Sequence, residues 1–207
     1  MRHAELGRDP ILTARLIRKV DRALIELLES LTIDDWHAPT IVRDWKVLDV
    51  TSHLLDTALR KLSLVRDSHF AEIVVIDSPS DVIELVNRLN EEGVRVYRRL
   101  SPAVLITLMK TACAESADLH ESLEPFGPAA FPVSWAGEAE SQNWFDTARE
   151  LTERWHHQQQ IRLAVNKPGI MTPELYRPVL DCFLRGLPHL YRGVEARADA
   201  AIEVVIS

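Results

Sequence analysis

The chain of 207 residues is long enough for one ordinary domain, or for one domain with a small appendage. Apolar residues make up 46% and charged residues 27%, a balance that excludes an intrinsically disordered chain. The net charge of -7 argues against nucleic acids and anionic membrane surfaces as partners, and seven glycines are few for folds built on phosphate-binding loops.

Through most of the chain, apolar residues recur at intervals of three or four, the spacing typical of amphipathic α-helices. The first predicted helix has Asp9 as its N-cap and Pro10 at its first position, and it extends to Leu31. The remaining helices are predicted at about residues 45–68, 80–100, 102–123, 142–165 and 173–187. We therefore expect an all-α fold, with the helices packed as a bundle over residues 1–195.

Two segments depart from this helical pattern. A β-branched run at residues 73–76 predicts an extended connection that packs into a crevice. Residues 201–207 read as a short C-terminal strand, which would need a partner outside an all-helical domain. We therefore treat residues 196–207 as a separate strand, either paired with a small element or beginning a second domain.

The two cysteines, Cys113 and Cys182, form no CxxC pair and no disulfide framework, which is typical of a reducing compartment. Cys113 has no activating histidine motif, so we expect a buried and inert thiol. No apolar leader follows Met1, and no apolar run approaches the roughly 20 residues of a membrane helix. These features predict a cytoplasmic protein.

Most of the eight histidines are expected at the surface, because they lie near predicted ends or in charged surroundings. These five are His3, His37, His69, His120 and His189. The five tryptophans are expected to pack loops onto the helices, and Trp135 and Trp144 flank the longest irregular stretch, where they could line the mouth of a pocket.

Three other residues form a candidate metal site. His53 borders the apolar stripe of its predicted helix, and Glu153 and His157, four residues apart, share one face of another. Two imidazoles and one carboxylate are a known ligand set for catalytic zinc, with the fourth position open, although nickel, iron or manganese also accept such ligands. The alternatives are a hydrogen-bonded histidine at the core edge and a surface Glu–His pair, and His156 is a weaker candidate ligand.

Two segments carry a resemblance to a known family. The first comprises LTIDDW at 31–36, PT at 39–40 and DWKVLDVTSHLL at 44–55, and the second is ERWHHQQQIR at 153–162, preceded by FPVSWAG at 131–137. Together they resemble the mycothiol-dependent maleylpyruvate isomerase family, within the DinB-like superfamily of metal-binding bundles. The resemblance covers about residues 10–195.

The resemblance implies a DinB-like up-down-down-up four-helix bundle with extra helices. It also implies that His53, Glu153 and His157 are the metal ligands, usually of Zn2+ with Ni2+ as the other choice. Members commonly carry an aspartate at the position of Gln160, and full-length members continue into a small α/β domain. We assign Trp45, Trp135, Gln160 and Arg162 to the substrate or thiol pocket, and no catalytic residue beyond the metal site.

The resulting functional hypothesis is a metal-dependent enzyme that uses mycothiol as a thiol cosubstrate on small electrophilic substrates. Because a metal-bound thiol is deprotonated near neutral pH, its sulfur could add to an activated double bond in an isomerisation, or displace a leaving group in an S-transfer. The first alternative is a non-catalytic metal-binding bundle that serves as a sensor or interaction module. The second is a bundle without metal, in which Glu153 and His157 face solvent. A homodimer is a further expectation, because exposed apolar stripes and several tryptophans are available.

Overall fold

The computed structural model describes residues 9–42, 44–70, 74, 79–195 and 197. Every regular element within these residues is helical, which confirms the all-α class. The long helices are α1 (Ala14–Glu29), α3 (Val47–Lys61), α4 (Pro79–Tyr97), α5 (Pro102–Ser122), α6 (Asn143–Ala164) and α7 (Pro173–Leu184). The short elements are α2 (Ile33–Trp36), α8 (Leu187–Leu190), a π-helical turn η1 (Leu62–Arg66) and a 3-10 turn η2 (Ser134–Ala136).

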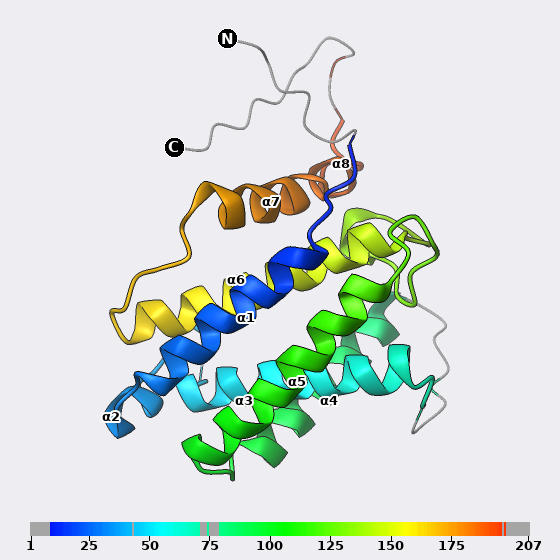
Figure 1. Cartoon of the computed structure of the whole chain (residues 1–207). Coiled ribbons are helices and arrows are strands. Elements are labelled where there is room, and N and C mark those ends of the chain that lie inside the picture. The colour runs from blue at the N-terminus through cyan, green and yellow to red at the C-terminus, as the bar shows by residue number, and fades with distance from the viewer. Residues whose placement is uncertain (1–8, 43, 71–73, 75–78, 196, 198–207) are drawn as a thin grey trace.

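Four helices form a closed set of neighbours, because α1 and α3 each pack against both α5 and α6 (Figure 1). Helices α1 and α5 are antiparallel, since Arg18 pairs with Asp118 while Glu29, near the other end of α1, pairs with Lys110. The directions of α3 and α6 follow from the contacts that α1 and α3 make with α6.

Helices α1 and α6 run in the same direction, because Asp21 lies beside Arg154 and the carbonyl of Ala23, further along α1, accepts a hydrogen bond from Arg162, further along α6. In contrast, α3 and α6 are antiparallel: His53 contacts Glu153, and Lys61, two turns later, contacts an earlier turn of α6. As a result, one face of α3 lies along the face of α6 that carries the predicted ligands.

The main apolar core fills the space between these helices and includes the short helix α2. Its buried members are Leu24, Leu27, Leu28, Trp36, Val47, Val50, Leu54, Leu55, Ala58, Leu105, Met109, Ala112, Cys113 and Ile161. A second cluster joins α1, α5 and α6 to α7 through Ile17, Val20, Ala117, Leu151, Trp155, Leu175 and Val179. The third cluster consists of Ile11, Val133, Phe145, Ala148 and Cys182.

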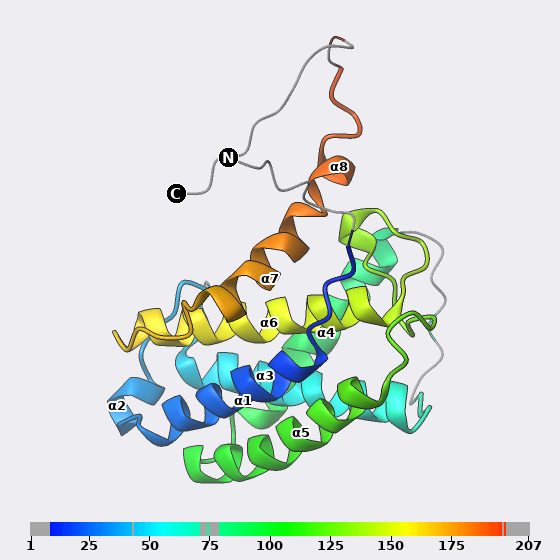
Figure 2. The same ribbon diagram turned by 45° about the horizontal axis from the view of Figure 1, so that its top comes forward.

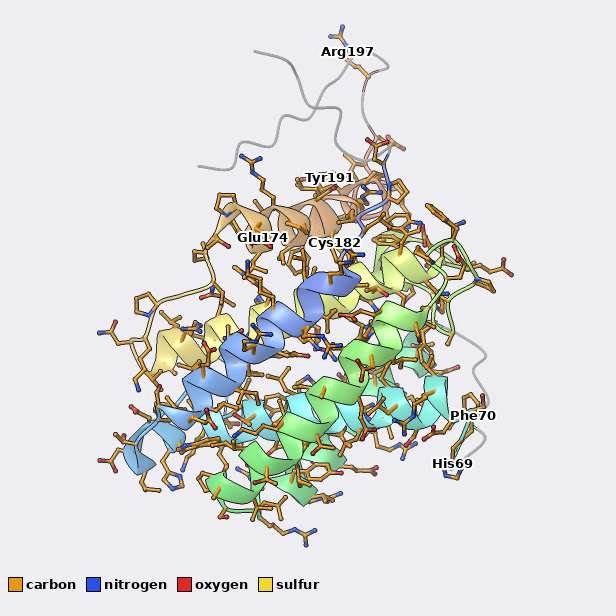
Figure 3. The ribbon with its side chains drawn as sticks, viewed as in Figure 1. His69, Phe70, Glu174, Cys182, Tyr191 and Arg197 are labelled. Carbon is orange, nitrogen blue, oxygen red and sulfur yellow. The ribbon has the colours of Figure 1, made fainter. Side chains whose placement is uncertain are left out.

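Two helices lie outside this set of four. Helix α4 packs against α3, and α7 packs along α6 on another side of the molecule (Figures 1 and 2). Figure 3 labels two side chains of α7: Glu174, which pairs with Lys19 of α1, and Cys182, which is buried. No helix among the described residues is both long and apolar enough to cross a membrane.

The structure corrects the predicted start of the first helix. Asp9 and Pro10 do not open it; α1 begins at Ala14, with Thr13 as its N-cap. The reason is tertiary, because Ile11 is buried in the third cluster and the chain must reach that cluster before the helix can start. Neither α2 nor α8 was expected, although the Thr32–Asp35 capping box of α2 is a local signal.

The other helix predictions are confirmed to within a few residues, and Ser101 caps α5 as its Ser–Pro sequence predicts. Most of the predicted extended run at 73–76 and the whole C-terminal strand at 201–207 lie outside the described residues.

Candidate metal centre

His53 is buried because α3 is enclosed by α4, α5 and α6. The polar residues next to His53 in α3 are also buried, and the Thr51 and Ser52 hydroxyls are satisfied by donating to carbonyls one turn earlier in the same helix. The side chain of His53 is only 3% exposed. Such a position requires partners for a polar ring, and α6 supplies one of them.

The three predicted ligands converge on one point. The Nε2 atom of His53 lies 3.3 Å from Oε1 of Glu153, and Nε2 of His157 lies 3.0 Å from the same oxygen. The two imidazole rings meet edge to face, with centroids 4.7 Å apart. One potential ligand atom from each residue lies within 4.8 Å of the other two.

The charges at this point favour an ionised carboxylate. Burial raises the pKa of Glu153, but hydrogen bonds and charge interactions with His157 and His53 outweigh it and lower the pKa well below its usual value. Burial lowers the pKa of His157, yet the adjacent Glu153 and Gln160 reverse this effect, so the net direction is upward. The side chain of His157 is 12% exposed and that of Glu153 is 40% exposed. A bundle without metal was expected to expose both Glu153 and His157 to solvent, but His157 is largely enclosed.

These residues fit a divalent metal ion. Each offers a nitrogen or oxygen atom with a free electron pair, and the three atoms are close enough to share one cation. Two neutral imidazoles and one carboxylate suit zinc, and they also suit nickel. Because Glu153 is partly exposed, the centre is open to solvent on its side.

Two of the predicted pocket residues lie beside this centre. The ring of Trp45 packs against His53, with centroids 5.3 Å apart. The side-chain oxygen of Gln160 lies 2.7 Å from Nδ1 of His157. These contacts place Trp45 on the α3 side and Gln160 on the α6 side.

The structure does not bring the other two predicted pocket residues into contact with the ligands. Trp135 packs between Phe145 and Phe183, in the region of η2 and α7. Arg162 donates hydrogen bonds to the carbonyls of Lys167 and Ala23, so it links the end of α6 to α1.

Sequence reasoning missed a buried ionic network one to two turns from the centre. Lys61 of α3 lies 2.5 Å from Asp146 and 3.4 Å from Glu150, both on α6. Arg154 bridges Glu150 at 2.9 Å and Asp21 at 3.2 Å. Burial raises the pKa of Glu150, but the adjacent cations, Lys61 first among them, lower it well below its usual value. The network therefore holds opposite charges together between α1, α3 and α6.

The expectation of a buried Cys113 is confirmed, and burial raises the pKa of its thiol. The expectation of a surface His120 is wrong, because its side chain is almost completely buried between α5 and α6. Its neighbours in the sequence are charged, but tertiary packing encloses the helix face that it occupies.

Residues 17–162 match the family model described as the mycothiol maleylpyruvate isomerase N-terminal domain. No curated protein and no solved structure matches the chain significantly. The matched segment covers most of the chain and contains both helices that meet at the centre. The chain therefore belongs to the mycothiol maleylpyruvate isomerase N-terminal domain family.

Proposed function

We propose that the chain binds one divalent metal ion through His53, Glu153 and His157, and that it takes part in mycothiol-dependent chemistry on small electrophilic substrates. The observation that carries this proposal is the convergence of the three side chains, from two helices, within 4.8 Å. Family membership supports mycothiol as the thiol. Zinc is the proposed metal, with nickel as the alternative that the same ligands would accept.

The chain's own residues have distinct tasks in this proposal. His53 supplies a ligand from the enclosed helix α3, and Glu153 supplies the one negative charge, on the solvent-accessible side. A bound divalent ion would act as a Lewis acid that lowers the pKa of a coordinated thiol. Trp45 and Gln160 flank the ligands, so we retain both as pocket residues. Arg162, which is bonded to two carbonyls, has a structural role instead.

The thiol sulfur is the nucleophile in either of two reactions. In an isomerisation it adds to an activated double bond and leaves after rotation about the resulting single bond. In an S-transfer it forms a carbon–sulfur bond while a leaving group departs with its electron pair. Both need the same activated sulfur, so the site supports them equally.

We also propose that α1, α3, α5 and α6 form the DinB-like up-down-down-up bundle of a domain that spans residues 1–195. The pair directions support it, since α1 runs with α6 and against α5, and α3 runs against α6. The cytoplasmic location and the homodimer remain predictions from the sequence.

Metal analysis of the purified protein tests the proposal. We expect close to one equivalent of metal in the unsubstituted protein and in His69→Ala, which alters an exposed histidine (Figure 3). His53→Ala and His157→Ala should each lose the metal. Metal retention by both variants would refute the proposed ligand set.

Turnover of electrophilic substrates with mycothiol then tests the chemistry. Activity should require both metal and thiol, and it should fall to background in His53→Ala and His157→Ala. A tightly bound metal without thiol affinity or turnover would instead favour the non-catalytic sensor or interaction module. The folded state of each variant is checked by circular dichroism, so that a loss of metal can be separated from a loss of structure.

A further inference from the structure

The side-chain amide of Gln160 lies between two imidazoles. Its Oε1 atom lies 2.7 Å from Nδ1 of His157, and its Nε2 atom lies 2.9 Å from Nε2 of His156. Gln160 is 8% exposed, so solvent has little access to these two contacts. The amide therefore links a proposed metal ligand to a second histidine that does not join the ligand cluster.

The chemistry of the amide determines which atom carries the proton at each contact. An amide oxygen can only accept, so Nδ1 of His157 must donate to it. The amide nitrogen can only donate, so Nε2 of His156 must accept from it. With its Nδ1 proton donated to Gln160, His157 presents Nε2 to Glu153, where Nε2–H donates to the carboxylate and where loss of that proton would free an electron pair for a metal ion.

We propose that Gln160 is a positioning residue for the metal centre: it holds His157 in the tautomer that presents Nε2 to the metal, and His156 holds the Gln160 amide in the orientation that this requires. This inference rests on the proposed function, because it concerns the same centre. Outer hydrogen bonds of this type fix both the tautomer and the ring orientation of a ligating histidine.

The helix makes this arrangement rigid. Gln160 is three residues after His157 and four after His156, the two separations at which side chains on one α-helix face each other. All three residues belong to α6, so no loop has to be ordered for the contacts to form. The proposed device is therefore in place before the metal binds.

The amide also affects the charge of the centre. The Gln160 amide presents an acceptor oxygen to His157 and adds no negative charge. The ligand set consequently retains the single charge of Glu153, and a bound divalent ion would leave a net positive centre for an anionic sulfur. Gln160 thus orients His157 without adding a charge beside the ligands.

Zinc affinity, measured by competition with a chromophoric chelator, tests the role of Gln160. We expect Gln160→Leu to weaken zinc binding by about 10-fold to 100-fold, the usual effect of removing such an outer partner. Gln160→Glu restores an acceptor oxygen and should recover most of the affinity. The matched control is Gln158→Leu, which alters a fully buried amide with no hydrogen-bond partner in the described structure and should leave zinc affinity unchanged.

The tautomer provides a readout that general destabilisation would not change. Nitrogen-15 NMR of the zinc-loaded protein should show zinc on Nε2 of His157 with a proton on Nδ1, and a mixture of Nε2 and Nδ1 coordination in Gln160→Leu. Wild-type zinc affinity together with an unchanged tautomer in Gln160→Leu would overturn the inference. If Gln160→Leu gives that result while His53→Ala and His157→Ala lose zinc, the proposed metal site still holds. Absence of zinc binding in the unsubstituted protein would refute both the metal site and the role of Gln160.

Discussion

At the scale of single residues, His120 is a buried histidine that lies outside the metal centre. It is 1% exposed, its Nδ1 lies 3.2 Å from the Thr147 hydroxyl, and its Nε2 has no hydrogen-bond partner among the described residues. Burial, followed by the charge of Arg154, lowers its pKa to about 4. The other charged groups that act on it are Glu150, Lys61 and Asp146. The native state therefore contains a neutral imidazole next to an ionic network.

Neutral His120 predicts a loss of stability in mild acid. Its folded pKa of about 4 is below the ordinary value of 6.5, so the unfolded chain takes up the proton first as the pH falls. The free energy of unfolding should then decrease between pH 6.5 and 4, by at most about 3 kcal/mol from this group. Urea unfolding of the metal-free protein across this range should show a shallower decrease for His120→Asn. Parallel pH profiles for the two proteins would contradict this assignment.

The sequence predicts contacts within one helix but does not predict which helices face each other. Glu153 and His157 could be paired from their spacing on one helix, and the residue types indicated a metal ligand set. Nothing local specifies that α3 faces α6, because that depends on how distant segments pack. His120 was misplaced for the same reason, since its charged sequence neighbours point away from the surface that α6 covers.

At the scale of elements, α3 and α4 approach each other closely at a glycine. The Asp56 carboxylate occupies the space next to Gly93, and a Cβ added to Gly93 would lie 2.2 Å from Cγ of Asp56. Arg60 reinforces this contact by donating to Asp56 and to Asn90 of α4, each at 2.7 Å. The small residue therefore determines how closely α4 can pack against the helix that carries His53.

Gly93→Ala should destabilise the protein despite the better helix propensity of alanine. Overpacking at a close contact costs about 1–3 kcal/mol, and the propensity gain returns at most about 1 kcal/mol. We expect a net decrease of about 1–2 kcal/mol in the free energy of unfolding, measured with urea. Gly193→Ala is the control, because no atom lies within 4 Å of its added Cβ. Equal stability of the two variants would show that α4 can move aside without cost.

Element boundaries followed from the sequence wherever the signal was local. The Ser101–Pro102 start of α5 is such a case, because a hydroxyl cap and a proline act within one turn. Asp9 and Pro10 offered the same kind of signal, yet burial of Ile11 in another part of the molecule outweighed it. The ionic network around Lys61 and Glu150 could not be foreseen, since its members come from helices far apart in sequence.

At the scale of the whole molecule, the proposed metal site joins two halves of the chain. His53 and Glu153 are separated by 100 residues and lie on antiparallel helices that both contribute to the main core. A cation bound to both helices would hold them together and would bind the native state far more tightly than the unfolded chain. The centre is therefore expected to contribute to stability as well as to chemistry.

Zinc should accordingly raise the stability of the unsubstituted protein. At a free concentration 100 times the dissociation constant, the gain expected for one site is about 2.7 kcal/mol. Thermal unfolding followed by calorimetry, with and without zinc, measures this gain, and a chelator should reverse it. His157→Ala should show no zinc-dependent shift. A shift of equal size in His157→Ala would place the stabilising ion at another position.

The extended segment before α1 affects how α7 is held. Ile11 packs in the same cluster as Cys182 of α7, and the carbonyl of Asp9 accepts a hydrogen bond from Arg185, just beyond that helix. Residues 9–11 thus help to hold α7, a helix from the C-terminal part of the described chain. Native-state hydrogen exchange should detect this coupling as one cooperative unit, with the amides of α7 losing protection when residues 9–12 are deleted while those of α3 keep it.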